Sequence, residues 1–394
     1  MPKLTIEQLS LSGKRVFVRA DLNAPLEGGQ VADDTRLSAV VPTVRYALDA
    51  GASVVLASHL GRPKGGPDAK YSLEPVAERL AVLLGRPVPL APDCVGPATF
   101  AQAQALKPGD VLLLQNLRFH PEEEKNDDAF ARQLAQLADC YVNDAFAAAH
   151  RAHASIAAIT RHLQPAAAGL LMQRELGALG RILESPERPL VALLGGAKVS
   201  DKVALVEHLI GKVDALVIGG GMAFTFLRAL GHSIGRSLVE PERIETARGA
   251  LEAARRRGVQ LTLPVDVVVA DGIDSDSGRP VGIREIPDTQ MGLDIGPRTT
   301  ERFAAVLKSA RTIVWNGPMG VFEKPPFATG TLAVAHAVAE ATAFSVIGGG
   351  DTIAAVNMAA VADRIGYIST AGGAFLEFLE GRSLPGVEAL TEVR

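Results

Sequence analysis

Charged and amide side chains follow several apolar segments in the first half of the chain. In chain order they are Asp21, Asn23, His59, Arg62, Arg118, His120, His150 and Arg151. Arginine presents a planar fork that fits phosphate or carboxylate, and histidine donates a hydrogen bond. One such arginine is more often solvated or ion-paired. Several cationic groups in succession, in a chain of net charge −4, instead predict a site that reads an anionic molecule through side chains.

Glycine clusters take the same positions in the second half of the chain. They are Gly195–Gly196, Gly219–Gly221, Gly348–Gly350 and Gly372–Gly373. Glycine allows the backbone to approach a ligand closely. The second half therefore predicts a site built mainly from backbone.

Two lysines accompany the first of these clusters, in the segment Gly195–Lys202 (GGAKVSDK). Lys198 and Lys202 are four residues apart, so we expect them on one face of a helix that begins here. Two cations at a helix N-terminus oppose the helix dipole, which indicates that an anion lies between them. The alternative is an exposed basic first turn.

Asp351 stands in a glycine turn, Gly348–Thr352 (GGGDT), that leads into a helical pattern. The residue is either a simple helix cap or a ligand for Mg²⁺ beside a phosphate that the turn binds. The chain contains neither GxxxxGK[ST] nor GxGxxG, which argues against a P-loop ATPase and a nicotinamide dehydrogenase.

The other histidines and the two cysteines do not indicate a metal site or a nucleophile. His150 and His153 are three residues apart but have no third ligand at a suitable spacing, so a zinc site is rejected there. Cys94 and Cys140 are interpreted as ordinary thiols, and two cysteines exclude a disulfide scaffold and favour a reducing compartment.

Bulk composition describes a globular chain, with 47% hydrophobic and 21% charged residues. The mild charge predicts no nucleic-acid partner, and no apolar run approaches the length of a membrane helix. The N-terminal MPKLTIEQLS has no apolar stretch typical of a signal peptide. We therefore expect a cytoplasmic location and no membrane partner.

The elements that must position these residues are short apolar runs between amphipathic stretches. The runs are Arg15–Arg19, Ser53–Ala57, Val111–Leu114, Cys140–Val142, Leu190–Leu194, Ala215–Ile218, Val265–Val269, Thr312–Trp315 and Phe344–Ile347. Runs without alternation predict strands buried on both faces, and strand alternating with helix predicts parallel sheets. In such sheets ligands bind beyond the carboxyl ends of the strands. A polar, proline-containing segment, Leu183–Pro189, follows the helical pattern Leu170–Leu183 and predicts a domain boundary.

Taken together, these segments resemble the phosphoglycerate kinase family. The resemblance runs through VFVRADLNAP (Val16–Pro25), SHLGRP, NLRFH, AHRAHAS, GGAKVSDK, IGGGMAFTF, LDIGP, WNGPMGVFE, GGGDT and STAGGAFLEFLEG (Ser369–Gly381). It covers nearly the whole chain.

The resemblance implies an α/β fold of two lobes, each a parallel sheet flanked by helices in Rossmann-like fashion, joined by a helix. The expected segments are an N-terminal lobe (1–170) for 3-phosphoglycerate or 1,3-bisphosphoglycerate, a connecting helix and hinge (171–188), a C-terminal lobe (189–380) for ADP or ATP, and a tail (381–394) that returns to the first lobe. It also implies reversible phosphoryl transfer with Mg²⁺, by a monomer whose lobes close.

The resemblance assigns roles to particular residues. The expected substrate-binding residues are Asp21, Asn23, Arg36, His59, Arg62, Arg118 and Arg151. The expected nucleotide-binding residues are Lys198, Lys202, Gly292, Glu323, Gly349, Gly350, Asp351 and Thr352, with Asp351 directed to the metal. The expected catalytic residues are Arg36, Lys198, Lys202, Gly350 and Gly373.

Some positions depart from the pattern of the family. Ala371 stands where glycine is typical, Ala147 and Ala148 replace a common Gly-Thr, and Gln115 replaces a common glutamate. An added methyl at Ala371 crowds a helix start or forbids a positive φ angle. Two other classes, a two-domain dehydrogenase and a non-catalytic phosphate- or sugar-binding protein, remain as alternatives.

Overall fold

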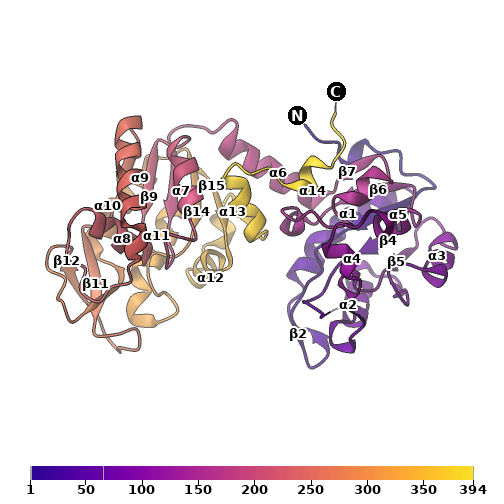
Figure 1. Ribbon diagram of the computed structural model, residues 1–394, viewed down its shortest axis with the longest axis horizontal. Helices are drawn as coiled ribbons and strands as arrows, with labels where there is room; N and C mark the ends of the chain where they lie inside the picture. The colour runs from indigo at the N-terminus through magenta and orange to yellow at the C-terminus, as the bar shows by residue number, and fades with distance from the viewer. Residues whose placement is uncertain (1, 65, 394) are drawn as a thin grey trace. The chain divides into compact units, whose positions relative to one another are not determined.

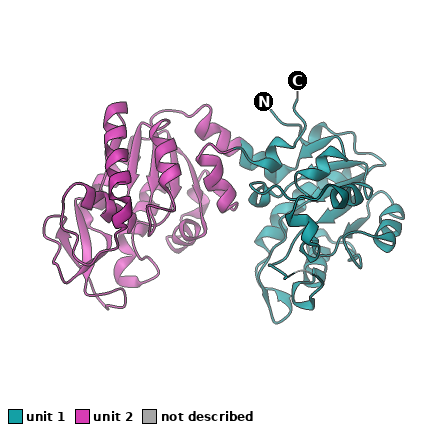
Figure 2. Cartoon of the chain, viewed as in Figure 1, with its two compact units in different colours: residues 1–176, 383–394 teal, residues 177–382 magenta. Residues whose placement is uncertain are grey.

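The computed structural model describes residues 2–64 and 66–393. The chain divides into two compact units (Figure 2). The first comprises the residues up to Leu176 together with the segment from Ser383 onward, and the second is Gly177–Arg382. The division falls inside helix α6 (Leu170–Leu183).

The first unit contains a five-stranded parallel sheet in the order β5-β4-β1-β6-β7. Its strands are β1 (Arg15–Arg19), β4 (Ser53–Ala57), β5 (Val111–Leu113), β6 (Cys140–Asn143) and β7 (Ala166–Ala168), with a separate pair β2 (Leu26–Glu27) and β3 (Gln30–Val31). Its helices are α1 (Thr35–Asp49), α2 (Glu74–Leu84), α3 (Pro97–Gln104), α4 (Pro121–Glu124), α5 (Asp128–Ala135), the start of α6, and α14 (Pro385–Glu388).

Local sequence accounts for the bounds of these elements. Helix α2 has Pro75 in its first turn and ends at Gly85, whose φ of 68° few other residues adopt. Strand β1 alternates between the two faces of the sheet: Val16 and Val18 pack in the core with residues of α1 and α2, while Phe17 stacks on Tyr141 at a ring separation of 6.0 Å. Both faces are covered, which explains the unbroken apolar runs.

The second unit contains a six-stranded parallel sheet in the order β10-β9-β8-β14-β15-β16. Its strands are β8 (Leu190–Leu194), β9 (Ala215–Ile218), β10 (Gln260–Thr262), β14 (Thr312–Asn316), β15 (Phe344–Gly348) and β16 (Tyr367–Ser369). Its helices are the end of α6, α7 (Val203–Ile210), α8 (Met222–Ala229), α9 (Ile244–Arg257), α10 (Pro297–Lys308), α11 (Thr329–Glu340), α12 (Gly350–Met358) and α13 (Gly373–Leu379).

Short 3-10 helices connect these elements. They are η1 (Ile6–Gln8), η2 (Ala69–Tyr71), η3 (Leu117–Phe119), η4 (Phe146–Ala148), η5 (Ala158–Arg161), η6 (Pro241–Arg243), η7 (Pro325–Phe327) and η8 (Ala362–Arg364).

The direction of the chain across the second sheet reverses between β8 and β14. The chain runs from β8 outward to β9 and β10, and then from β14 outward to β15 and β16. A crevice forms at such a reversal, beyond the carboxyl ends of the strands. In the first unit the corresponding reversal lies between β1 and β6.

The predicted fold class is confirmed, since both main sheets are parallel and flanked by helices (Figure 1). One strand differs from the expectation. The run Val265–Val269 becomes β11 (Asp266–Ala270), which pairs antiparallel with β12 (Arg279–Gly282) and β13 (Met291–Ile295) in a small separate sheet. Its apolar residues pack against Phe224 and Leu227 of α8, and an apolar run alone does not encode the direction of its partner.

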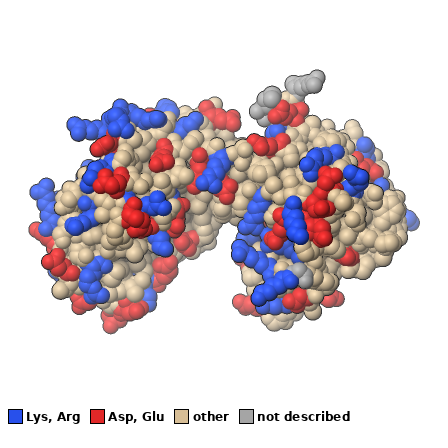
Figure 3. Space-filling model, in the orientation of Figure 1, with Lys and Arg blue, Asp and Glu red and all other residues tan. Residues whose placement is uncertain are grey.

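The surface carries both signs of charge. On the face drawn in Figure 3, basic and acidic side chains are interspersed over each unit. Among the described helices, none is both long enough and apolar enough to traverse a lipid bilayer.

Candidate active site

The strands of the first unit deliver a cluster of cationic and imidazole groups to one edge of the sheet. His59 follows β4 and is buried, with Nδ1 3.3 Å from Nη2 of Arg19 at the end of β1. A guanidinium only donates, so Nδ1 accepts and the neutral ring carries its proton on Nε2. His59 is therefore arranged as a hydrogen-bond donor through Nε2.

Three arginines lie close enough to His59 to affect its pKa. Burial, followed by the charges of Arg19, Arg118 and Arg151, holds the pKa of His59 well below its usual range. Burial, followed by the charges of the same three arginines, lowers the pKa of His153 to about 3. The fold thus gathers these arginines around two neutral imidazoles, and a bound anion would be favoured by their concentrated positive charge.

The loops after β1 and β4 are tied together by side chains. Arg36 of α1 donates from Nη1 to Oδ2 of Asp21 at 2.8 Å. Asn23 accepts from the backbone N–H of Gly61 at 2.8 Å, and Arg118 donates to the carbonyl of Gly61 at 2.7 Å. Two of the predicted substrate residues, Asn23 and Arg118, are therefore held at the turn of Gly61, and two others, Asp21 and Arg36, are paired with each other.

The remaining predicted residues of this unit lie nearby in sequence but differ in environment. Arg62 follows Gly61 and is exposed. Arg151 is half-buried and donates from Nε to Nε2 of His150 at 3.0 Å. The structure brings His59, Arg118 and Arg151 together, and joins Asp21, Asn23 and Arg36 through hydrogen bonds, whereas Arg62 is free to reorient toward a ligand.

In the second unit, the reversal between β8 and β14 contains a buried amine. Lys202 Nζ donates to the carbonyl of Asn316 at 3.0 Å and also to its side-chain oxygen. Burial lowers the pKa of Lys202 to about 8, against the opposing charges of Asp201 and Asp351. A lysine held in this way remains positive near neutrality but is easily deprotonated.

The expectation that Lys198 and Lys202 share a helix face is wrong. Helix α7 begins only at Val203, with Lys202 as its N-cap. The backbone N–H groups of Val199 and Ser200 donate to the carboxylate of Glu240, at 2.5 and 3.0 Å, so the segment forms a turn. Lys198 is exposed on this turn.

Two glycines lie beside Lys202 and its partner Asn316, at positions where a side chain does not fit. A Cβ on Gly317, which has a φ of 96°, would lie 2.6 Å from Lys202 Nζ. A Cβ on Gly349, with a φ of 94°, would lie 2.7 Å from Nδ2 of Asn316. Glycine is therefore required at both positions by space and by backbone conformation.

The start of α12 faces the same edge. Gly350, Asp351 and Thr352 form its first turn, and Thr352 Oγ1 accepts from the N–H of Gly317 at 2.7 Å. A Cβ added to Gly350 would meet no described atom within 4 Å, so the helix start opens onto free space. N–H groups of a first helical turn attract anions, which makes this turn suited to phosphate.

A cavity of about 360 Å³ adjoins these loops. Gly292, Glu323 and Asp351 lie in its wall, which is otherwise mostly apolar. Gly292 donates its N–H to Ser237 Oγ at 2.9 Å and packs against the ring of Phe224, leaving no room for a side chain. The size and lining suit a flat aromatic group such as a nucleobase.

Three residues with a part in these sites were not predicted from the sequence. Arg19 donates to Ser155 and His59, Asn316 accepts from Lys202, and Asp294 lines the cavity. Burial raises the pKa of Asp294 to about 7, although it accepts from the N–H groups of Gly330 and Ile295. A charged residue at the end of an otherwise apolar strand was the available signal for Arg19.

The residues around Asp351 fit a magnesium ion. Mg²⁺ usually binds one or two carboxylates and completes its shell with water and substrate phosphates. Asp351 is exposed in the first turn of α12, beside the backbone N–H groups of that turn. One free carboxylate next to a phosphate cradle is the donor set that this chemistry requires.

Comparison with known proteins agrees with this geometry. The sequence model of the family described as phosphoglycerate kinase matches residues 6–382. The chain belongs to the phosphoglycerate kinase family. The phosphoglycerate kinase of Moorella thermoacetica is 57% identical over 393 residues and covers 100% of both chains.

Solved structures of the phosphoglycerate kinase family have the same fold. The phosphoglycerate kinase of Coxiella burnetii matches with a TM-score of 0.93 at 44% identity, over 98% of each chain. That of Pyrococcus horikoshii matches with a TM-score of 0.80 at 35% identity, also over 98% of each. Membership of this family makes the chain a kinase.

The departures from the phosphoglycerate kinase pattern are accommodated locally. Gln115 accepts from the N–H groups of Leu73 and Asn116, both at 2.9 Å. Ala147 and Ala148 lie in η4. Asn126 and Ala360 are the described non-glycine residues with positive φ, so Ala371 is not in the conformation that its methyl disfavours.

Proposed function

We propose that this member of the phosphoglycerate kinase family transfers the acyl phosphate of 1,3-bisphosphoglycerate to ADP, reversibly, giving 3-phosphoglycerate and ATP. One observation carries the proposal. Each unit presents its own anion-directed edge of a parallel sheet, built from cationic side chains in the first unit and from glycine backbone with Lys202 in the second. Two anionic substrates that exchange a phosphoryl group require two such sites.

The reaction breaks the bond between phosphorus and the carboxyl oxygen of the substrate and forms a bond from phosphorus to a terminal oxygen of ADP. In the reverse direction the acceptor is the carboxylate of 3-phosphoglycerate. Both acceptor oxygens are ionised at neutral pH, so no general base is needed. Catalysis then consists of in-line positioning and stabilisation of the charge on the moving group.

The proposed roles follow the two sites. Asp21, Asn23, His59, Arg62, Arg118 and Arg151 bind phosphoglycerate, and Gly292, Glu323, Gly349 and Thr352 bind the nucleotide. Arg36, Lys198 and Lys202, with the N–H groups of Gly350 and Gly373 at the starts of α12 and α13, stabilise the transferred phosphoryl group.

Asp351 would hold Mg²⁺ beside the nucleotide phosphates, and the ion would neutralise part of their charge. The position of Asp351 in the first turn of α12 supports this role. The negative charge of Asp351 raises the pKa of Lys202, so the two groups are close, and Lys202 would add its positive charge to that of the ion.

The test is turnover of ATP and 3-phosphoglycerate, measured as NADH oxidation through coupled glyceraldehyde-3-phosphate dehydrogenase. We expect turnover to require Mg²⁺ and 3-phosphoglycerate, and Lys198→Ala to reduce kcat about 100-fold or more, as for removal of one transition-state donor. Lys308→Ala, an exposed lysine at the end of α10, is the matched control. Binding of both ligands without turnover would contradict the proposal and favour a binding protein.

We also propose direct transfer upon closure of the two units, because the two substrates bind to separate units and water must be excluded. Small-angle scattering should give a smaller radius of gyration with both ligands than with either alone. An unchanged radius in the ternary complex, or a phospho-enzyme that chases into product, would contradict this mechanism.

A monomer in the cytoplasm completes the proposal. The free thiols of Cys94 and Cys140 support a reducing compartment. Sedimentation equilibrium at assay concentration should give the mass of one chain.

A further inference from the structure

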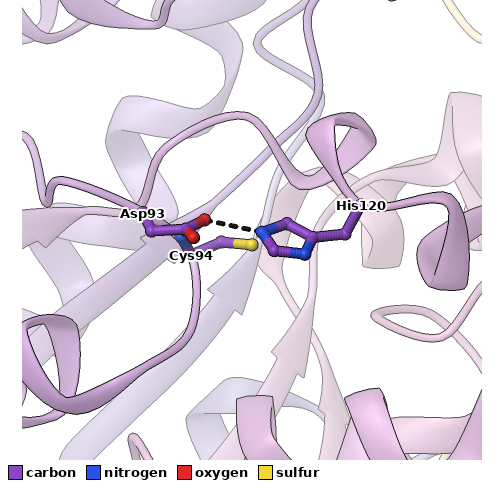
Figure 4. Close-up of side chains that lie close together, drawn as sticks. All are labelled: Asp93, Cys94 and His120. Carbon is purple, nitrogen blue, oxygen red and sulfur yellow. Dashed lines mark hydrogen bonds and ion pairs between the residues drawn. The ribbon is translucent and has the colours of Figure 1, made fainter. Parts of the chain in front are cut away.

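Three side chains with metal-binding atoms meet in the first unit, outside the residues assigned to phosphoglycerate (Figure 4). Asp93 and Cys94 lie in the segment before α3, and His120 lies between η3 and α4. One carboxylate oxygen, the sulfur and one ring nitrogen are all within 4.8 Å of one another. Within residues 2–64 and 66–393, this is the group of three His, Cys, Asp or Glu residues that meets that distance.

The three side chains are held in place from several directions. Oδ1 of Asp93 is 2.7 Å from Nε2 of His120 and accepts from the N–H of Cys94 at 2.6 Å. The carbonyl of Asp93 accepts from Thr99 Oγ1 at 3.0 Å. The ring of His120 stacks on Phe130 of α5, with centroids 5.2 Å apart. The cluster is therefore largely preorganised by segments distant in sequence.

Access to the cluster is one-sided. Cys94 is fully buried, whereas the side chains of His120 and Asp93 are 27% and 44% exposed. An ion can reach the carboxylate and the imidazole from solvent and meet the thiol behind them. The exposed side also leaves a coordination position for water.

The donor set indicates the class of ion. Thiolate, imidazole and carboxylate are the ligands of Zn²⁺, whereas Mg²⁺ and Ca²⁺ prefer oxygen ligands alone. Zinc bond lengths place neighbouring ligand atoms of a tetrahedron roughly 3.3–3.6 Å apart. The Asp93–His120 contact needs to open by less than about 1 Å to reach that spacing, which a small rotation of the partly exposed carboxylate provides.

Cys94 can bind a metal ion only as its thiolate. Burial, followed by the neighbouring Asp93 and Glu123, raises the pKa of the Cys94 thiol well above its usual range. Without a metal the thiol stays protonated beside a histidine–aspartate pair, and this thiol is a poor nucleophile. A divalent ion that binds here takes the place of the thiol proton.

We propose that Asp93, Cys94 and His120 form a binding site for Zn²⁺, with water as the fourth ligand. This site is separate from the proposed magnesium position at Asp351, which is in the other unit. The proposal does not depend on the kinase reaction, since binding is measured on the untagged protein without substrates.

The decisive probe is Co²⁺, which substitutes for Zn²⁺ and reports its ligands by absorption. We expect one equivalent to give a sulfur-to-cobalt charge-transfer band and the intense visible bands of a four-coordinate ion, both abolished by one equivalent of Zn²⁺. Cys94→Ser should remove the charge-transfer band. Cys140→Ser, which alters the other buried thiol, should retain it.

Zinc affinity is then measured by competition with a chromophoric chelator. Asp93→Asn and His120→Gln should each weaken binding by at least about tenfold, because even loss of a ligand-supporting contact has an effect of that size. His162→Gln removes an exposed histidine–aspartate pair, His162–Asp128 at 2.9 Å, and should leave the affinity unchanged. Thermal unfolding of each variant identifies any that fail to fold. If Cys94→Ser fails to fold, the variants at the partly exposed Asp93 and His120 still test the proposal.

Either of two results would overturn the proposal. One is the absence of a charge-transfer band in folded wild-type protein at one equivalent of Co²⁺. The other is zinc affinity that is equal in wild type, Asp93→Asn and His120→Gln, which would reduce the cluster to an ion pair beside an inert thiol.

Discussion

Burial lowers the pKa of two residues of the candidate active site, but one becomes neutral near neutral pH and the other keeps its charge. His59 becomes a neutral donor because burial and three arginines lower its pKa. Lys202 remains positive near neutrality, with a pKa of about 8, although it is almost completely buried. Keeping this charge inside the second unit opposes stability, and in the role proposed for Lys202 the phosphate groups of a nucleotide would offset that penalty when they bind.

The charge of Lys202 predicts an alkaline limit on activity. Raising the pH through about 8 removes the proton and with it the positive charge, so kcat/KM for nucleotide should fall above that pH in the free enzyme. Lys202→Ala should have low kcat/KM that is nearly flat between about pH 7 and 9. Lys308→Ala should follow the wild-type profile. Steady-state kinetics across this range make the comparison, and an alkaline limb that survives in Lys202→Ala would contradict the assignment.

Residue chemistry could be predicted from the sequence further than residue geometry. Glycine after a strand, or arginine after a strand, is visible in the letters, and these positions do line the carboxyl edges of the sheets. Arg19 was missed because it belongs to the strand itself. The shared helix face of Lys198 and Lys202 was wrong because Glu240, distant in sequence, accepts the backbone N–H groups and delays the helix to Val203.

The positions at which helices α12 and α13 begin determine how the glycine-rich loops of the second unit are arranged. Helix α12 begins at Gly350 after Gly349, and helix α13 begins at Gly373 after Gly372. Gly372 has a φ of 56° and a ψ of −115°, a conformation that other residues avoid. Ala371, one position earlier, is buried and donates its N–H to Ser369 Oγ at 3.3 Å. The family glycine is therefore dispensable at 371 and required at 372.

This difference predicts unequal effects of two single-methyl changes on the free energy of unfolding. Ala371→Gly should destabilise by about 1 kcal/mol through added freedom of the unfolded chain, with kcat unchanged. Gly372→Ala should destabilise by about 1–3 kcal/mol, because alanine must adopt a strained conformation although nothing obstructs its methyl. Urea unfolding of both variants provides the comparison. A larger loss for Ala371→Gly would show that the methyl of Ala371 has a packing role instead.

Elements could be predicted from the sequence wherever an apolar run sits in a parallel sheet. Strand β11 was also predicted as a strand, but its pairing was not, because its neighbours β12 and β13 come later in the chain and both run antiparallel to it. Strands β7, β10 and β16 are short and carry small or polar residues, so their pairing with a neighbour, and not their own composition, makes them strands.

At the scale of the whole molecule, the chain visits the first unit twice. The segment from Ser383 onward belongs to that unit and is bound to it by backbone hydrogen bonds. Gly386 N–H donates to Ala149 at 2.8 Å, and Thr391 N–H donates to Ala166 in β7 at 2.9 Å. A Cβ on Gly386 would lie 2.7 Å from Ile156, so the segment packs closely as well.

Removal of residues 383–394 should therefore destabilise the first unit selectively. The free energy of unfolding of the first unit should fall by several kcal/mol, because backbone partners and apolar contacts are lost together. Hydrogen exchange read out by mass spectrometry in each unit distinguishes the two. Lys3→Ala removes the Nζ contacts to Glu392 and to the carbonyls of Glu388 and Leu390 but leaves the backbone of the tail in place, so it should destabilise the first unit by less than the truncation does. Equal loss of protection in both units would contradict a local role for the tail.

The return of the tail also sets an order of assembly during translation. Every residue of the second unit, up to Arg382, leaves the ribosome before the segment that completes the first unit. Until Thr391 has emerged, the carbonyl of Ala166 at the edge of the first sheet lacks the backbone partner that it has in the folded protein. The unit whose synthesis begins first is thus the last to be finished, and nascent chains should expose that sheet edge to chaperones throughout the synthesis of the second unit.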